Sequence, residues 1–337
     1  MPKYFFRCKT ELLKAKVNSR LRQQHLMYQS QMLIDGRDLP LEEGSGRRAV
    51  IYNPASQEAV AEVAVGRRQD ARLALQAAWR AFPIWSGSSS QKRADILHDA
   101  ADRVRERAEG IARLLTLEQG KPLKFAKTEV LSSADVLDYY AEEGKRSYGQ
   151  WLAGPRSRSI ILRQPIGVAA LITPWNYPVD LLAWKVAPCL AAGCTFVAKP
   201  PSLAPLAATE FVRTVCSAGL PAGAANVVHG PGGEVGAELV ESPISRKIAF
   251  TGETATGRWI MAAAAAHIKR ISLELGGQSP FIVCADADIK AAAASAAQRA
   301  FSNMGQICIS VNRIYVADEV AEAFTDELVA RTERFKI

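Results

Sequence analysis

Short apolar runs alternate with helical segments over the second half of the chain, and this alternation constrains the fold more than any other feature. It begins at Gly167, where the runs GVAALI, CTFVAK, NVVHG, RKIAFTG, KRISLEL and PFIVCA follow one another with helical spacing between most of them. The predicted helices cover 179–192, 205–218, 233–241, 254–267 and 288–302. Such alternation predicts an α/β fold with a doubly wound parallel sheet of the Rossmann type.

The first half of the chain has a different pattern. Alternating apolar and polar residues over Met32–Leu39 predict an early strand, and Asn53-Pro54-Ala55 predicts a turn. Three helical stretches follow, and Ser159–Arg163 has the composition of a strand. The three predicted helices cover 70–82, with Asp70 as N-cap, 91–118 as one continuous helix, and 121–148, with Pro122 at its start.

The positive charge lies almost entirely at the N-terminus. Residues 1–26 hold seven Lys or Arg and one acid, so they carry +6 of the formal net charge of +8. The remaining 311 residues are nearly neutral, which argues against a nucleic-acid partner. We therefore predict a basic extension over residues 1–30 without ordered structure. It could be a targeting peptide, a flexible tail or a start codon assigned too early, and we favour the latter two because no secretory apolar region is present.

Composition excludes several classes of protein. The chain is 48% hydrophobic and 23% charged, and none of its apolar runs reaches the length of a membrane span. The six cysteines form no CxxC pair, and none of the four histidines lies near a cysteine in sequence. We expect no metal site, no disulfide framework and no membrane partner, and a reducing cytoplasm as the location.

The residues after each predicted strand are the first candidates for a site, because open α/β sheets bind ligands at the carboxyl ends of their strands. After GVAALI comes Thr173-Pro174-Trp175-Asn176-Tyr177-Pro178, in which two prolines flank an amide. An amide N–H at such a position is able to stabilise a developing oxyanion. The alternative is a rigid turn that caps the following helix, and this segment alone favours neither interpretation.

A second group of residues suits a nucleotide. Lys199 ends the run CTFVAK and is held by two prolines before Ser202, although a solvated lysine at a strand end is the simpler interpretation. Two glycine-rich segments, 230–236 and 252–257, each follow a strand and open a helix. Their backbone N–H groups could approach a pyrophosphate, but neither segment is a clean GxGxxG, so each is weak evidence by itself.

Two further side chains could act as base and nucleophile. Glu274 lies in an apolar run before two glycines, where burial is expected to raise its pKa, and the alternative is a salt-bridged strand residue. Cys308 ends the segment NMGQIC, and the alternative for a lone cysteine is packing in the core. A thiol, a carboxylate and an amide donor on one sheet scaffold together favour covalent catalysis.

Taken together these segments resemble the NAD(P)-dependent aldehyde dehydrogenase superfamily. TPWNYP, VAKP, FTGETATG, LELGG and the GQIC cysteine occur in that family's order and relative spacing, from about Gln31 to the C-terminus. The resemblance implies that Cys308 is the nucleophile, that Asn176 and the Cys308 N–H hold the oxyanion, and that Glu274 activates water. It also implies that Lys185 lies near this site and that a small-molecule aldehyde is the substrate.

The resemblance also implies a cofactor, NAD or NADP, held mainly by the domain over residues 31–274. Lys199 matches the lysine that contacts the adenosine ribose, and Gly252 and Gly257 match residues that frame the pyrophosphate. The full set of implied cofactor-binding residues is Thr173, Pro174, Trp175, Lys199, Ser202, Gly232, Gly236, Thr251, Gly252, Glu253, Gly257 and Leu275.

Several positions depart from the family pattern. Many NAD-preferring members carry Glu at the position of Ser202, so we expect NADP to be tolerated beside NAD. Glu253 stands where the family usually has Ser, and its charge would oppose a phosphate unless it turns away. Succinate-semialdehyde dehydrogenases, which the sequence otherwise resembles, carry one arginine directly before the position of Lys185 and another directly before the position of Asn303. This chain has Trp184 and Ser302 at those two positions. The substrate is therefore a semialdehyde or, as we prefer, an uncharged aldehyde.

The end of the chain is the largest departure. The family continues well over a hundred residues beyond its cysteine, whereas this chain stops at Ile337, 29 residues beyond Cys308. We therefore expect residues 275–337 to form the first part of a truncated catalytic domain. The family's oligomers, dimers or tetramers, would use a hairpin near 151–164. The alternative to an active enzyme is an inactive remnant that retains at most nucleotide binding.

Overall fold

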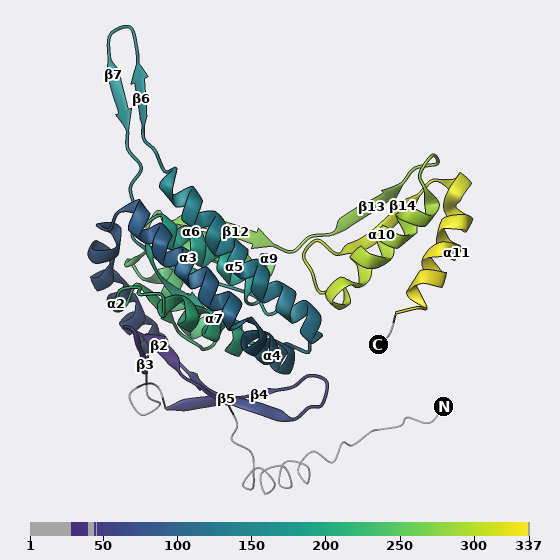
Figure 1. The fold of residues 1–337 in the computed structure, drawn as a ribbon, viewed down its shortest axis with the longest axis horizontal. Coiled ribbons are helices and arrows are strands. Elements are labelled where there is room, and N and C mark those ends of the chain that lie inside the picture. Colours follow the sequence, from purple (N-terminus) through teal and green to yellow (C-terminus); the bar gives the residue numbers. More distant parts are fainter. Residues whose placement is uncertain (1–27, 40–43, 45, 336–337) are drawn as a thin grey trace, which may run out of the picture.

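The computed structural model describes residues 28–39, 44 and 46–335 (Figure 1). Most of the predicted basic extension, residues 1–27, lies outside the described residues. Its last three residues differ from the prediction, because Tyr28–Ser30 form strand β1, which pairs in parallel with β5 (Ala59–Val65). The antiparallel strand β4 (Arg47–Tyr52) completes this small sheet beside the main body.

The central element is a seven-stranded sheet in which five strands are parallel, as the alternating runs predicted. Its strands, in spatial order, are β12 (Arg270–Leu275), β11 (Ser245–Gly252), β8 (Val168–Ile172), β9 (Thr195–Lys199), β10 (Ala225–Val227), β2 (Met32–Ile34) and β3 (Arg37–Leu39). The last two strands are antiparallel. All residues of β8 and β9 are buried, which explains why these strands consist of uninterrupted apolar runs.

Helices cover both faces of this sheet, so the doubly wound fold is confirmed. Ala169 and Leu171 of β8 belong to one core, whereas Val168, Ala170 and Ile172 belong to the other, as the period of two in a strand requires. The first core is built with α3 (Ser90–Glu106), α4 (Ala108–Gln119), α5 (Leu123–Lys145), α6 (Asp180–Ala191) and α7 (Leu206–Cys216), and the second with α2 (Arg68–Ser86), α8 (Ala237–Glu241) and α9 (Thr254–Ala265).

Three predicted helices differ from the structure in more than the exact position of their ends. The helix predicted over 91–118 is two helices, α3 and α4, which meet at Arg107, whose guanidinium pairs with Glu210 and donates to Thr214 Oγ1 at 3.2 Å. Asp70 lies inside the first turn of α2, where its carboxylate accepts the Arg67 N–H at 2.7 Å. The helix predicted over 233–241 begins with a π-helical turn, η1 (Gly232–Gly236).

A hairpin projects from the body, as Figure 1 shows. Its strands β6 (Gln150–Ala153) and β7 (Arg158–Ile161) are exposed over their whole length. Trp151 and Ile160 face each other in this hairpin and are 60% and 64% exposed. Large apolar side chains with so much exposure are typical of a surface that meets another protein.

The C-terminal residues form a unit of their own after β12. Strands β13 (Ser279–Val283) and β14 (Val311–Val316) pair in parallel and pack with α10 (Ile289–Phe301) and α11 (Ala321–Thr332). The boundary predicted between residues 274 and 275 falls inside β12, because both residues belong to that strand. Among the described residues, every helix is too short or too polar to cross a membrane.

Candidate active site

Most predicted site residues lie where the parallel strands of the central sheet end. Lys199 is the last residue of β9 and is paired with Ile172, directly before Thr173. Thr251 and Gly252 end β11 beside Glu274 and Leu275 of β12, in register. Because the carboxyl ends of parallel strands share one edge of a sheet, the fold gathers these residues there.

A hydrogen bond joins the loop after β8 to the loop that bears Cys308. The Asn176 side-chain amide donates from Nδ2 to the carbonyl of Gln306 at 2.8 Å. In return, the Asn303 amide donates to the Asn176 carbonyl at 3.3 Å. Asn176 and Cys308, 132 positions apart in the numbering, therefore belong to contacting loops. One N–H of the Asn176 amide is used in this contact, which leaves its second N–H for a ligand.

Cys308 itself is exposed, so packing in the core does not account for it. It lies in a tight turn in which the Ser310 N–H donates to the Ile307 carbonyl at 3.0 Å. The turn follows three consecutive residues with left-handed backbone, Asn303, Met304 and Gly305, whose φ angles are 49°, 58° and 73°. A methionine in this conformation carries strain of about 1–3 kcal/mol, and strain of this kind clusters at functional sites.

Glu274 is exposed, so the burial predicted for it is wrong. The reason is that one face of β12 is covered and the other is open: Ile271, Leu273 and Leu275 pack against the core, and the residues between them do not. Alternate residues of this strand, including Arg270, Ser272 and Glu274, face outward. Because the Glu274 carboxylate is already exposed to solvent, a water molecule can contact it directly.

Lys185 connects Glu274 to the rest of the site. This lysine, on α6, donates from Nζ to Thr251 Oγ1 at 2.6 Å. Burial lowers the pKa of Lys185 to about 8, and the negative charge of Glu274 opposes that decrease. The Lys185 ammonium therefore lies within the electrostatic reach of Glu274.

The residues around Lys199 fit a polar, phosphate-bearing cofactor. Lys199 is buried, and its Nζ has a weak hydrogen bond of 3.4 Å to the Pro200 carbonyl. Thr173 Oγ1 is buried too, with no hydrogen-bond partner among the described residues. Gly236 lies against the Lys199 side chain, and a Cβ at Gly232 would meet open space. Buried polar groups with so few partners are the groups that a ligand can satisfy.

The glycines of the second glycine-rich segment are required by the packing of the protein itself. A Cβ at Gly252 would lie 2.5 Å from the Phe250 ring, and one at Gly257 would lie 2.7 Å from Leu275 Cδ2. Gly257 thus allows α9 to pack closely on β12. Glu253, by contrast, is exposed at the N-cap of α9 and makes no side-chain cap hydrogen bond.

The remaining predicted cofactor residues are more accessible. Pro174 is half-buried and Trp175 is 39% exposed, in the loop that carries Asn176. Ser202 is exposed, and its hydroxyl donates to the Gly230 carbonyl at 3.4 Å, beside the turn that leads into η1. These side chains lie at the surface around the buried Thr173 and Lys199.

The buried charge of Lys199 predicts a measurable effect on stability. Burial lowers its pKa from 10.5 to about 8. Between these values the unfolded chain binds a proton that the folded protein releases, so the Lys199 contribution makes unfolding less favourable as pH rises from about 8 to about 10. At pH 7 the same group destabilises the folded state, and Lys199→Met is expected to raise the unfolding free energy by about 1–3 kcal/mol.

Urea unfolding at pH 7 and pH 10 measures this effect. The gain in Lys199→Met should be large at pH 7 and small at pH 10. Lys290→Met, at an exposed position of α10, is the matched control and should change stability by less than about 0.5 kcal/mol at either pH. A Lys199→Met protein that is less stable than the wild type at pH 7 would contradict the assignment.

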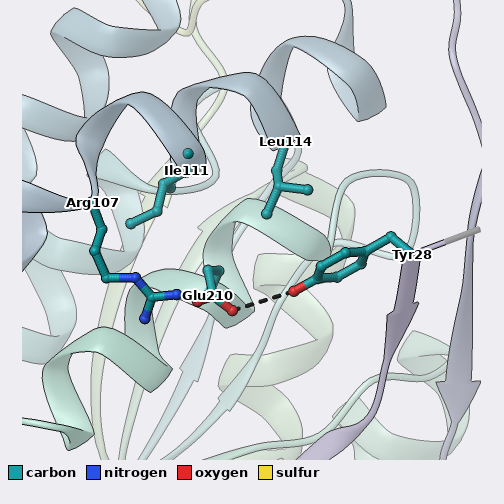
Figure 2. A pocket seen from close by; sticks show the side chains of 6 residues that line it. Tyr28, Arg107, Ile111, Leu114 and Glu210 are labelled. Atoms are coloured by element: carbon teal, nitrogen blue, oxygen red, sulfur yellow. Dashed lines mark hydrogen bonds and ion pairs between the residues drawn. The ribbon is translucent and has the colours of Figure 1, made fainter.

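A cavity of about 420 Å³ lies elsewhere in the protein (Figure 2). It is lined by Tyr28, Arg107, Gly110, Ile111, Leu114 and Glu210, none of which the sequence predicted for the site. The Tyr28 hydroxyl donates to Glu210 Oε2 at 3.3 Å, and burial raises the pKa of Tyr28 to about 12. These contacts link β1 to α7, so the polar groups of this cavity already have structural partners.

Sequence reasoning missed the residues that hold Asn176. Its carbonyl accepts hydrogen bonds from Lys121 Nζ at 2.9 Å and from Gln119 Nε2 at 3.5 Å, besides that from Asn303. In the sequence Lys121 and Pro122 indicated the start of a helix and nothing more. A lysine that becomes fully buried has no local signature, since its burial depends on α5 and on the loop after β8.

Comparisons with known proteins match most of the chain. The family described as "Aldehyde dehydrogenase family" matches residues 41–337. The glutarate-semialdehyde dehydrogenase of Pseudomonas aeruginosa and the NADP(+) succinate-semialdehyde dehydrogenase GabD of Escherichia coli are each 42% identical over 313 residues. Each alignment covers 92% of this chain and 64% of the relative, so the chain spans less than two thirds of their length.

A solved structure gives the same result for the fold. The betaine aldehyde dehydrogenase of Staphylococcus aureus, determined in complex with NAD+, superposes with a TM-score of 0.87 at 33% identity. The superposition covers 91% of this chain and 61% of that one. The predicted fold class is therefore confirmed by structural comparison as well as by the sheet order.

Proposed function

The chain belongs to the aldehyde dehydrogenase family, and we propose that it oxidises an aldehyde to a carboxylic acid with NAD or NADP. The observation that carries the proposal is the 2.8 Å hydrogen bond between Asn176 Nδ2 and the Gln306 carbonyl. It fixes an amide donor next to the turn that presents the exposed Cys308. A nucleophile beside an oxyanion donor is the arrangement that acyl-type chemistry requires.

The thiolate of Cys308 attacks the aldehyde carbon, and a C–S bond forms while the carbonyl oxygen gains negative charge. The second N–H of Asn176 and the backbone N–H of Cys308 stabilise this oxygen. When bound, NAD(P) supplies the oxidant, because it accepts the hydride that leaves the former carbonyl carbon. Cys308 then carries a thioester, which divides one difficult oxidation into two easier steps.

Glu274 completes the reaction by taking a proton from water, which attacks the thioester carbon. The C–S bond breaks, Cys308 leaves as a thiolate, and the product is a carboxylic acid. The Lys185 ammonium lies within the electrostatic reach of the Glu274 carboxylate. No histidine is needed in this scheme, because a thiol is intrinsically more nucleophilic than a serine hydroxyl.

Lys199 and Ser202 are proposed to hold the adenosine part of the cofactor, with Thr173 Oγ1, Gly232 and Gly236 near its other polar groups. The support is the buried, poorly partnered ammonium of Lys199 and the orphan hydroxyl of Thr173. Pro174, Trp175, Thr251, Gly252, Glu253, Gly257 and Leu275 complete the proposed surface. Ser202 carries no negative charge, so the 2′-phosphate of NADP meets no repulsion at this position.

Replacing Ser202 with glutamate is expected to shift cofactor preference toward NAD. A carboxylate beside the 2′-phosphate should weaken NADP binding about tenfold relative to NAD, because like charges repel. Dissociation constants for both cofactors, measured by calorimetry without an aldehyde, give the ratio directly. Ser202→Ala, which adds no charge, should leave the ratio within about twofold, and an unchanged ratio in Ser202→Glu would place the 2′-phosphate elsewhere.

An uncharged aldehyde is the substrate class that we propose first. Trp184, 48% exposed and edge-on to Tyr140, and the exposed Ser302 stand where the resemblance led us to expect arginines for a carboxylate. Semialdehydes are the second substrate class that we propose, because two relatives at 42% identity are named for glutarate and succinate semialdehyde.

A panel of uncharged aldehydes and four- and five-carbon semialdehydes, followed at 340 nm with NAD and with NADP, tests the proposal. An increase in absorbance with any aldehyde supports the oxidation, and the relative kcat/KM values assign the substrate class. No increase with a folded sample would favour the alternative of a remnant that binds nucleotide at most.

We also propose a homo-oligomer, dimer or tetramer, and a cytoplasmic location. The exposed apolar strands β6 and β7 support the first, because burial against another copy would remove Trp151 and Ile160 from water. The second rests on cysteine usage, since the five cysteines of the described region are free thiols.

A further inference from the structure

A buried ion pair lies beneath the loop that carries Asn176. Lys121 lies between α4 and α5, its Nζ pairs with the carboxylate of Glu129 on α5, and both side chains are at most 2% exposed. The Lys121 ammonium also lies 3.7 Å from the centroid of the Tyr177 ring. Both charges are therefore held away from water, beside the residue that follows Asn176.

The two charges are directed at the loop and at the helix that follows it. Lys121 Nζ donates to the Asn176 carbonyl at 2.9 Å. The other oxygen of Glu129 accepts the backbone N–H groups of Val179 and Asp180 at 3.0 and 3.3 Å, where α6 begins. The pair therefore forms hydrogen bonds to the main chain on both sides of Tyr177 and Pro178. Lys121 binds Asn176 before them, and Glu129 binds the start of α6, the helix that carries Lys185, after them.

Packing alone does not explain this arrangement. Removing two charges from water is costly, and a pair of apolar side chains of similar size often stabilises a core as well or better. Burial lowers the pKa of Lys121 and raises that of Glu129, which is the sign of this desolvation. What the charged pair provides, and apolar residues do not, is directional hydrogen bonding to one carbonyl and two N–H groups.

The Asn176 carbonyl also connects the buried ion pair to the loop that carries Cys308. It accepts from Lys121 on one side and from Asn303 of the cysteine loop on the other, at 2.9 and 3.3 Å. Asn303 in turn shares the Gln306 carbonyl with the Asn176 amide, at 3.4 and 2.8 Å. Displacing the Asn176 main chain therefore changes where its amide N–H points relative to Cys308.

We propose that Lys121 and Glu129 are positioning residues that fix the Asn176 amide as the oxyanion donor for Cys308. This inference rests on the proposed function, but it concerns one part of it, the alignment of amide and thiol. Neither side chain touches the substrate; the pair acts through the main chain of Asn176 and the N-terminus of α6.

Two reactions of Cys308 separate positioning from general damage. Acylation by p-nitrophenyl acetate forms a C–S bond and an oxyanion that needs a donor, and then expels p-nitrophenolate. Alkylation by iodoacetamide forms a C–S bond and expels iodide at a saturated carbon, so no oxyanion develops. The ratio of the two rates at Cys308, each read by mass spectrometry of its peptide, therefore reports the oxyanion donor alone.

The variant to compare with the wild type is the double substitution Lys121→Met with Glu129→Gln. It removes both buried charges together, whereas either single change leaves one unpaired charge in the core and risks unfolding. The amide that Glu129→Gln introduces keeps an oxygen for the N–H groups of α6. Lys127→Met, on an exposed side chain of α5 that pairs with Glu109 at 3.4 Å, is the matched control.

We expect the acylation-to-alkylation ratio to fall about tenfold to a hundredfold in the double variant, because small misplacements of a catalytic group have effects of that size. The ratio in Lys127→Met should equal that of the wild type. A double variant that is folded by circular dichroism and keeps the wild-type ratio within twofold would overturn the proposal. Since neither reagent involves an aldehyde or NAD(P), wild-type protein that fails to oxidise aldehydes would count against the proposed function and leave this test intact.

Discussion

Cys308→Ala is expected to abolish NAD(P)H formation from every aldehyde that the wild type oxidises. Without the thiol no C–S bond forms, so the loss should be at least a thousandfold in kcat, the order of magnitude seen when a covalent nucleophile is removed. The measurement is the initial rate at 340 nm with saturating cofactor. Cofactor binding should persist, because Cys308 lies in a loop of the C-terminal unit and Lys199 lies in the central sheet.

Cys284→Ala is the matched control for this prediction. Cys284 follows β13 directly and is exposed like Cys308, but it lies in a different loop. Its replacement should leave the rate within about twofold, as surface substitutions usually do. Residual activity of more than a few per cent in Cys308→Ala, or a large loss in Cys284→Ala, would refute the assignment of the nucleophile.

Asn176→Ala is expected to reduce kcat/KM about a hundredfold to a thousandfold, the typical loss when one oxyanion donor is removed. A smaller effect on stability, about 1 kcal/mol, should accompany it, because the hydrogen bond to the Gln306 carbonyl is also lost. Steady-state kinetics and urea unfolding measure the two effects separately.

Two variants make this prediction specific. Asn176→Asp keeps the shape of the side chain but replaces its N–H donors with a charge that repels an oxyanion, so it should be at least as inactive as Asn176→Ala. Asn312→Ala, at an exposed position of β14, should change neither quantity. Wild-type kcat/KM in Asn176→Ala would mean that other donors hold the oxyanion.

The parts of the fold that depend on local pattern were predictable from the sequence. The strands β8 and β9 are continuous apolar runs because both faces of the sheet are covered, and the helices between strands carry their own periodicity. Features set by tertiary contacts were not. The break at Arg107 interrupts a regular helical pattern, and it coincides with the contacts of Arg107 to Glu210 and Thr214, about a hundred positions away in sequence.

The site shows the same division. Asn176, Lys199 and Thr251 follow or end apolar runs, so the rule that sites lie at strand ends could find them. The exposure of Glu274 could not be predicted, because it depends on which face of β12 other elements cover. Asparagine tolerates the left-handed backbone seen at Asn303, but that of Met304 has no signal in its side chain, since methionine disfavours the conformation.

The buried ion pair of Lys121 and Glu129 could not be predicted from the sequence, for a further reason. Lysine and glutamate usually lie at the surface, and Lys121 and Glu129 are eight positions apart in sequence, so no pattern suggests that they meet. Their contact depends on the packing of α5 beside the loop after β8. This loop supplies the Asn176 carbonyl and the Tyr177 ring that surround the Lys121 ammonium. Groups that act on a site through the main chain therefore escape a search for motifs.

The central claim is that aldehyde carbon becomes covalently bound to Cys308 during oxidation. The most direct measurement mixes the wild-type protein with an aldehyde and NADP, quenches with acid within a turnover, and analyses the Cys308 peptide by mass spectrometry. We expect an adduct with the mass of the aldehyde less two hydrogen atoms, as a thioester requires, and none on the other cysteines. NADPH formation without any adduct at Cys308 would contradict the account.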